Sequence, residues 1–360
     1  MLNTSIRLSL KEKLDFPAAL LSVALTVIWA VLSSLWRSEQ YPKSLLLHVG
    51  YAVFRKATAR LSIAQMQYIM PPSNKVYDIY SRKAKKIPDT VDLGDGAMGH
   101  WVGDRNAKHV LIWYHGGGFA LPANLGYFDF FTRLIADSAR NNKSLAVFAL
   151  TYTLAPQATY PTQLRQAVSA LRYILQETDN HPVDRVLLGG DSAGGNLVGG
   201  VLSHLAHPHP AIAPLPVTNL LAGAVMIAPW TFMGDYGEQT IDSRGDLITE
   251  AVGGPWSAAY LGSAPRDHYT DLSTAPPDWF TTFPVRKVLV TGGGSEILLP
   301  IIQDFVAKFR EGFPDVELCV GHREGHVAPI YNLYIGDRTE TEQGKRVKSW
   351  LQEMLQEEKM

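Results

Sequence analysis

The 360-residue chain has little cysteine, little net charge and no repetition. Its single cysteine, Cys319, excludes an intramolecular disulfide, so nothing demands an oxidising compartment. A formal net charge of −1 gives no electrostatic basis for binding nucleic acid. The chain also lacks an internal repeat, a low-complexity tract and a long run of like charge, whereas 46% hydrophobic residues are ample for a large core. Length alone suggests about two domains.

The most informative segment reads Gly-Gly-Asp-Ser-Ala-Gly-Gly-Asn at 189–196, directly after the apolar run 186–188. Leucine and valine then recur at helical spacing, so we expect a strand before the motif and a helix after it. A Gly-x-Ser-x-Gly pentapeptide in that position forms a tight, strained turn that exposes the hydroxyl of its serine, Ser192. A phosphate-binding loop is the alternative, but the segment lacks the Lys-Ser/Thr of a P-loop and the spacing of Gly-x-Gly-x-x-Gly. The pattern therefore predicts that Ser192 is a nucleophile.

A His-Gly-Gly-Gly run at 115–118 follows a strand-like segment at 110–114. Successive glycines let several backbone N–H groups point at one place, as a tetrahedral oxyanion requires. An isolated glycine run is more often a flexible loop, but this one lies between two apolar segments, upstream of the serine motif. We expect His115 to anchor the loop by a hydrogen bond. The predicted oxyanion donors are the N–H groups of Gly117, Gly118 and Ala193.

Together these motifs resemble the hormone-sensitive-lipase-like family of α/β-hydrolase esterases, and its fungal members in particular. A Tyr-Thr-Leu-Ala-Pro stretch at 152–156, followed by Tyr160-Pro161, is similar to another family motif. The resemblance covers roughly residues 100–335 in the family's chain order. It implies an α/β fold of the α/β-hydrolase type, with a mostly parallel central sheet flanked by helices and a helical cap.

The resemblance also implies a division of the chain. Residues 100–360 would form the core, with a cap insertion at about 231–283, and residues 38–99 would supply N-terminal cap helices and a lead-in. Residues 38–72 show helical spacing that ends at Pro71-Pro72. The insertion is rich in aromatic residues, which are more often packing residues than substrate contacts. Over a serine nucleophile they nevertheless favour an apolar acyl or alcohol group.

The family implies a catalytic acid and then a histidine after the serine. Glu296 stands where the family usually has an aspartate, and its expected role is to accept the imidazole Nδ1–H and fix the tautomer. A solvated loop carboxylate is the alternative for Glu296, with Asp304 and Glu324 as substitute acids. His326 is the expected base because it follows the last predicted strand and precedes an apolar residue.

Two histidine groups raise the alternative of a metal site. His322 and His326 are four residues apart, but Gly325 argues against the helix that would bring both rings to one face. The run from His204 to His209 is interrupted by proline, so we expect a solvated helix end there. We predict no metal site and no cofactor.

The resemblance implies a serine hydrolase that cleaves a carboxylic ester of a hydrophobic small molecule through a Ser192–His326–Glu296 triad and an acyl-enzyme. One alternative is that the same triad serves a step of secondary-metabolite biosynthesis, such as deacetylation, cyclisation or acyl transfer. Another is a non-catalytic receptor, as in the plant gibberellin receptors, which resemble the family but lack a working triad. The presence of all three triad residues disfavours a receptor.

Residues 17–36 contain no charged side chain and are long enough to span a bilayer as one helix. A single-pass anchor, with the rest of the protein cytoplasmic, is the favoured interpretation, and a helix buried in the cap is the alternative. A cleaved signal peptide is disfavoured because the run is long and no clear small-x-small site ends it. Basic residues flank both ends, which leaves the orientation open.

Overall fold

The computed structural model describes residues 6–178, 181–234 and 242–356. They contain an eight-stranded sheet in the order β1-β2-β4-β3-β5-β6-β7-β8, in which β1 and β2 are antiparallel to their neighbours and the other six strands are parallel. The strands are β1 (Thr90–Gly94), β2 (Ala97–Val102), β3 (His109–Tyr114), β4 (Leu145–Thr151), β5 (Val186–Asp191), β6 (Gly223–Ile227), β7 (Val288–Gly293) and β8 (Val316–Gly321).

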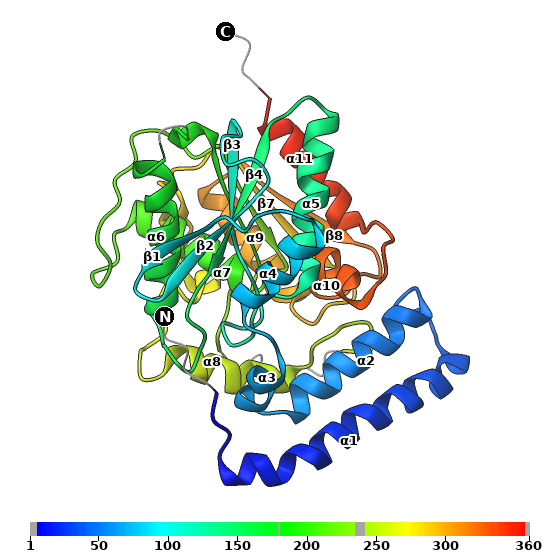
Figure 1. The fold of residues 1–360 in the computed structure, drawn as a ribbon. Helices are drawn as coiled ribbons and strands as arrows, with labels where there is room; N and C mark the ends of the chain where they lie inside the picture. The colour runs from blue at the N-terminus through cyan, green and yellow to red at the C-terminus, as the bar shows by residue number, and fades with distance from the viewer. Residues whose placement is uncertain (1–5, 179–180, 235–241, 357–360) are drawn as a thin grey trace.

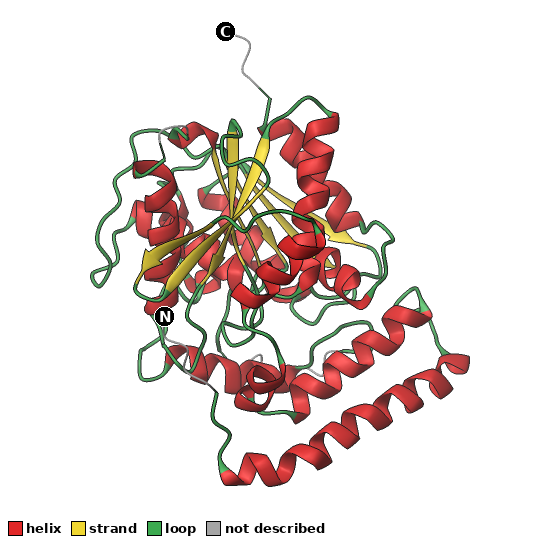
Figure 2. Cartoon of the chain, in the orientation of Figure 1, coloured by secondary structure: helices red, strands yellow, loops and turns green. Residues whose placement is uncertain are grey.

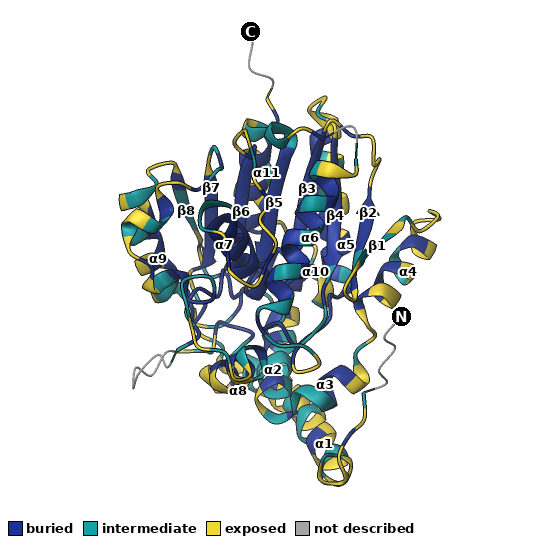
Figure 3. Ribbon diagram, turned by 90° about the vertical axis from the view of Figure 1, so that its left-hand side faces the viewer, coloured by how far each residue is buried: buried dark blue, intermediate teal, exposed yellow. Residues whose placement is uncertain are grey.

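The central strands are buried along their whole length, as parallel strands covered on both faces require. Figure 3 shows these strands as the buried centre of the molecule. Their continuous apolar sequences, which carry no alternation of polar residues, follow from that position. The predicted α/β class with a mostly parallel sheet is confirmed.

Helices cover both faces of the sheet (Figures 1 and 2). On one face α5 packs on β4 and on α4, α10 and α11, and α11 also contacts β6, β7 and β8. On the other face lie α6, α7 and α9. The bounds are α4 (Ser73–Lys83), α5 (Leu125–Arg140), α6 (Thr162–Gln176), α7 (Ala193–Ala206), α9 (Leu299–Gly312), α10 (Ala328–Ile335) and α11 (Glu342–Met354).

A second group of helices gathers beside the sheet at the lower end of Figure 1. It comprises α1 (Leu10–Ser33), α2 (Leu45–Arg60), α3 (Ile63–Ile69) and α8 (Gly253–Leu261), and short 3₁₀ turns occur at η1 (Ser34–Trp36), η2 (Val183–Arg185), η3 (Glu250–Val252), η4 (Leu272–Thr274) and η5 (Pro277–Phe280). The helix expected over 38–72 is wrong in part, because residues 38–44 are not helical. Ser44 caps α2, and Ser62 starts α3 with a capping box that interrupts the helical run.

The expected solvated helix end after α7 is also wrong. His204 and His209 are both buried, and the backbone N–H of His209 donates to His204 Nδ1 at 3.0 Å. His204 Nε2 lies 3.3 Å from the carbonyl oxygen of Ala213. The prolines therefore fold the chain back over the end of α7, and the histidines serve as hydrogen-bonding groups inside that turn.

One helix of the described residues is long and apolar enough to cross a membrane. It covers Leu10–Trp36, has a hydropathy of 2.2 over its most apolar 18 residues, and only 11% of that window is buried. Its first turn is fixed by a capping box between Ser9 and Glu12. Most apolar side chains of this helix thus face outward, away from the protein.

Candidate active site

Ser192 lies at the sharp turn between β5 and α7, where its backbone adopts φ 50° and ψ −118°. The backbone N–H of Ser192 donates to the carbonyl oxygen of Ile227 at 2.8 Å, which holds the strained turn against β6. The turn requires glycine next to it, because a Cβ on Gly194 would lie 1.8 Å from the carbonyl oxygen of Tyr114. This is the strained strand-to-helix geometry that the sequence motif predicts for a nucleophile.

His326 and Glu296 lie together, and His326 lines the same pocket as Ser192. His326 Nδ1 is 3.3 Å from Glu296 Oε1, and Glu296 Oε2 accepts a hydrogen bond from the N–H of Gly293 at 2.6 Å. Both side chains are almost fully buried. Burial alone lowers the pKa of His326, but the hydrogen bond that its Nδ1–H donates to Glu296 and the charges of Glu296, Asp246 and Asp191 outweigh it, so this pKa lies above its usual value.

The alternative residues lie elsewhere. Asp304 is exposed on α9, and His322 is also exposed. The buried carboxylate of Glu324 accepts hydrogen bonds from the N–H groups of Glu342 and Gln343, at the start of α11. Of the three acids considered from the sequence, Glu296 is the one with a hydrogen bond to His326.

Gly117 and Gly118 of the 115–118 loop line the same pocket as Ser192. Gly117 and Gly118 both have positive φ, at 96° and 59°, and a Cβ on Gly118 would lie 1.9 Å from the ring of Trp256. Within the described residues, neither glycine N–H donates to a protein acceptor. Ala193 is the first residue of α7, so its N–H has no partner within the helix.

His115 is held away from proton transfer. Burial lowers its pKa to about 4, so the ring stays neutral near pH 7. Its Nδ1 lies 2.8 Å from the carbonyl oxygen of Gly116, and the ring stacks on Tyr152, with the centroids 4.3 Å apart. The Tyr152 hydroxyl also donates to the carbonyl oxygen of His115 at 2.8 Å. These contacts hold His115 against Tyr152 and so anchor the loop of residues 115–118.

Asp191, next to Ser192, holds the glycine loop in place by hydrogen bonds, a role that the sequence motif did not indicate. Its Oδ1 accepts hydrogen bonds from the N–H of Gly116 and from Trp113 Nε1, each at 3.1 Å. Its Oδ2 accepts from the hydroxyl of Tyr127 at 2.7 Å. Burial raises the pKa of Asp191 to about 6. The residue before the predicted nucleophile thus fixes the loop that carries the predicted oxyanion donors.

Asp246 is a second residue that sequence reasoning missed. It is fully buried, and its Oδ1 accepts from the N–H of His326 at 2.8 Å and from that of Leu247 at 2.7 Å, while Oδ2 accepts from the N–H of Ile297 at 2.8 Å. One carboxylate therefore holds the backbone of His326 and of the residue after Glu296. No local motif marks this aspartate, because its partners are 51 and 80 residues away along the chain.

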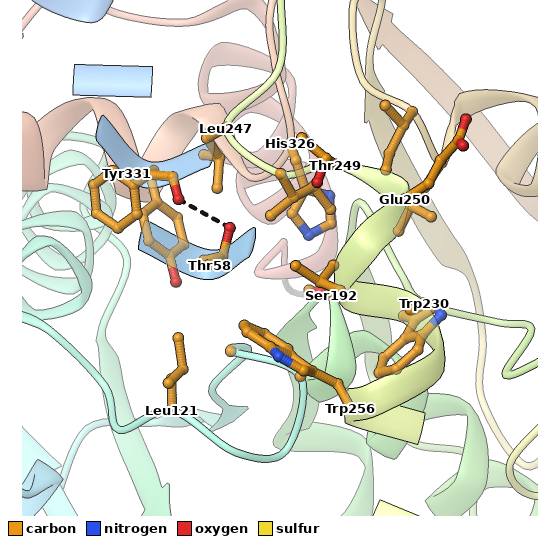
Figure 4. A pocket seen from close by; sticks show the side chains of 18 residues that line it. Thr58, Leu121, Ser192, Trp230, Leu247, Thr249, Glu250, Trp256, His326 and Tyr331 are labelled. Carbon is orange, nitrogen blue, oxygen red and sulfur yellow. Dashed lines mark hydrogen bonds between the residues drawn. The ribbon is translucent and has the colours of Figure 1, made fainter. Parts of the chain in front are cut away.

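Figure 4 shows the pocket above Ser192, into which the ring of His326 points. Two elements distant in the sequence close it, since α2 contributes Phe54 and Thr58 and the region of α8 contributes Trp256. The remaining lining is largely apolar and includes Leu121, Trp230, Leu247, Ile248, Val252, Ile297, Leu298 and Tyr331. Such a pocket can hold an apolar group next to a serine hydroxyl and an imidazole.

Replacing Glu296 with glutamine should lower kcat by about three to four orders of magnitude, because the imidazole loses its charged partner. The same change removes two influences that raise the pKa of His326, so the acid limb of the kcat/KM profile should move to lower pH. Glu296→Asp should keep partial activity. The matched control is Asp304→Asn, and a large loss of activity in that control would contradict this assignment.

Replacing Asp246 with asparagine should lower kcat by about 10- to 100-fold, because one of the backbone N–H groups that position His326 and Ile297 loses its acceptor. KM for a short ester should change little. Asp242→Asn is the matched control, since Asp242 is an exposed carboxylate on the same segment that pairs with Arg244. Equal kinetics for the two variants would show that Asp246 does not position the site.

Comparison with known proteins identifies the family. The family model described as the α/β hydrolase fold matches residues 111–329, more than half of the chain. The chain is 30% identical over 219 residues to an acetyl-hydrolase of Streptomyces hygroscopicus, covering 58% of this chain and 64% of that protein. It is 24% identical over 279 residues to steryl acetyl hydrolase 1 of Saccharomyces cerevisiae, covering 72% of this chain and 63% of that protein.

Each of these two matches thus spans slightly less than two thirds of the relative's length. A crystal structure of an esterase from the bacterial hormone-sensitive lipase family superposes with a TM-score of 0.61 at 23% identity, over 87% of this chain and 98% of that one. The fold is therefore the one that the sequence motifs predict. The chain belongs to the α/β-hydrolase family, and within it resembles the hormone-sensitive-lipase esterases.

Proposed function

We propose that this protein is a serine esterase that hydrolyses a carboxylic ester of a hydrophobic molecule. The observation that carries the proposal is the meeting, at one apolar pocket, of a strained serine and an imidazole that is hydrogen-bonded to a buried carboxylate. The names of the two relatives, an acetyl-hydrolase and a steryl acetyl hydrolase, support ester hydrolysis and favour an acetyl ester.

Ser192 Oγ attacks the ester carbonyl while His326 Nε2 takes the hydroxyl proton. Glu296 holds the Nδ1–H, which keeps the Nε2 lone pair available and stabilises the imidazolium. The N–H groups of Gly117, Gly118 and Ala193 receive the developing oxyanion, and each is worth about 3 kcal/mol of the barrier. The imidazolium returns its proton to the departing alcohol. Water then attacks the acyl-enzyme with His326 again as base, which releases the acid and restores the serine.

The substrate's apolar part would lie along the side of the pocket formed by α2 and α8. The lining holds one carboxylate, that of Glu250, but Phe54 of α2 and Trp256 of α8 present apolar rings on that side. This supports a hydrophobic alcohol or acyl group. We also propose that α2, α3 and the segment at about 231–283 form a cap over the core; residues 235–241 of that segment lie outside the described residues.

Association of the N-terminal segment with a membrane, with the catalytic core on the cytoplasmic side, completes the proposal. The support is the exposure of α1, whose most apolar window is only 11% buried. A helix buried in the cap would hide this surface. An apolar ester that partitions into lipid would then be concentrated near the enzyme.

Ser192→Ala should abolish both covalent labelling by a fluorophosphonate probe and hydrolysis of p-nitrophenyl acetate, because the reactive oxygen is lost. As a control for folding, the circular dichroism spectrum and the thermal midpoint of the variant should match those of the unmodified protein. Undiminished turnover in this variant would rule out the mechanism. Product analysis separates hydrolysis, which releases the free acid, from transfer of the acyl group to another acceptor, as in a biosynthetic step.

A further inference from the structure

Exposed apolar side chains are concentrated on one part of the molecule. Of the 20 large apolar side chains that are exposed in the described residues, 16 lie between Leu10 and Ile69. They occur along α1 and η1, at the start of α2 and at the end of α3. We call these exposed apolar side chains of residues 10–69 the apolar face. Exposed apolar side chains gathered in this way, in contrast to single scattered ones, are typical of an interaction site.

The apolar face is part of a helix pair, because α1 packs along α2 (Figures 1 and 2). Two small residues on the inner side of α1, Ala19 and Ala30, are 0% and 2% exposed. The first turns of α1 are also tied to the junction of α2 and α3. Asp15 forms a bidentate pair with Arg60 at 2.7 and 2.5 Å, and Glu12 accepts from the hydroxyl of Ser62 at 2.7 Å.

These ties conflict with a helix that crosses a bilayer. Because α2 packs along α1, a spanning α1 would carry the charged side chains of Arg55 and Lys56 into the hydrocarbon beside it, at high cost. The other side of α2 is bound to the core, since the guanidinium of Arg55 donates to the carbonyl oxygens of Arg244 and Asp246. A spanning α1 would therefore have to leave α2 first and break the Asp15–Arg60 pair.

A helix that lies in the membrane surface meets none of these costs. No charged side chain occurs from Phe16 to Trp36, and exposed lysines stand at both ends, at Lys11, Lys13 and Lys43. Basic residues at both ends leave the orientation of a spanning helix undecided. For a helix in the surface plane, both ends meet the anionic headgroups of one leaflet. Trp29 and Trp36, 69% and 77% exposed, suit the interfacial depth.

We propose that α1 lies in the plane of one lipid leaflet, and that this leaflet, with its anionic headgroups, covers the apolar face. The α1–α2 pair then forms a single layer between the membrane and the pocket, because α2 contacts α1 on one side and lines the pocket with Phe54 and Thr58 on the other. This proposal rests on the proposed membrane association and not on the proposed hydrolysis.

The first test compares the two ends of α1 in the full chain. Single cysteines are introduced as Arg7→Cys, Leu25→Cys or Ser38→Cys after Cys319→Ser, and sealed vesicles with the cytoplasmic face outward are treated with an impermeant maleimide. Residues 7 and 38 should be labelled equally with and without detergent, whereas residue 25 should be labelled only after detergent. Labelling of only one end in sealed vesicles would overturn the proposal, because it means that α1 spans the membrane.

The second test places a charge in the apolar face. Leu25→Glu and Trp29→Glu, at side chains 54% and 69% exposed, should lower binding to phosphatidylcholine–phosphatidylserine vesicles by at least about tenfold. Turnover of p-nitrophenyl acetate in solution should stay unchanged. The matched control is Ile87→Glu, since Ile87 is 92% exposed but lies between α4 and β1, outside the apolar face; its vesicle binding should match that of the unmodified protein.

Three results would overturn the proposal: no binding of the unmodified protein to these vesicles, equal loss of binding in Ile87→Glu, or a lipid-free dimer that Trp29→Glu dissociates. The last result would mean that a second copy of the chain covers the apolar face. Each result is separate from the test of hydrolysis. An active enzyme that does not bind vesicles would contradict the membrane proposal and leave the esterase proposal standing. An inactive protein that binds vesicles would contradict the esterase proposal and leave the membrane proposal standing.

Discussion

The site depends on how closely the start of α7 approaches β3. A Cβ on Gly194 would lie 1.8 Å from the carbonyl oxygen of Tyr114, and one on Gly190 would lie 2.3 Å from the carbonyl oxygen of Gly194. Only glycine allows two backbones this near one another. That approach brings the N-terminus of α7 beside the 115–118 loop. This one contact therefore positions Ser192 and Ala193 relative to the two proposed glycine donors, Gly117 and Gly118, which lie about 75 residues earlier in the sequence.

Two buried aspartates then fix the parts of the site that sheet pairing does not hold. Asp191 binds the N–H of Gly116 in the glycine loop, and Asp246 binds the N–H groups of His326 and Ile297. Burial raises the pKa of each to about 6, although hydrogen bonds to the carboxylate and the charge of His326 act in the opposite direction. A carboxylate has four acceptor positions, so one side chain can hold two or three backbone N–H groups in place. Loops from distant parts of the chain are joined to one another in this way.

The sequence predicts the local parts of this arrangement well and the long-range parts poorly. Apolar runs and glycine spacing indicate β3, β5 and the turn at Ser192, because these features depend on neighbouring residues. Asp246 could not be identified, since its role depends on partners in two other loops. The prolines near His204 suggested an exposed helix end for a similar reason. Whether a turn folds outward or back over the protein depends on tertiary contacts that no short pattern records.

The same limit applies to the prediction of how the N-terminal helix meets a membrane. Composition indicates an apolar helix of sufficient length, and a spanning anchor is the ordinary interpretation of such a helix. Length and composition do not report that Asp15 pairs with Arg60, or that α2 is joined to the core through Arg55. With those contacts, α2 becomes the element shared by the apolar face and the pocket. Its residues Tyr51 and Arg55 also reach Asn332 and the segment of Asp246. Movement of α2 away from the core would break the contact of Arg55 with Asp246, the residue whose carboxylate accepts the N–H of His326. The position of the α1–α2 pair is therefore coupled to the geometry of the proposed triad.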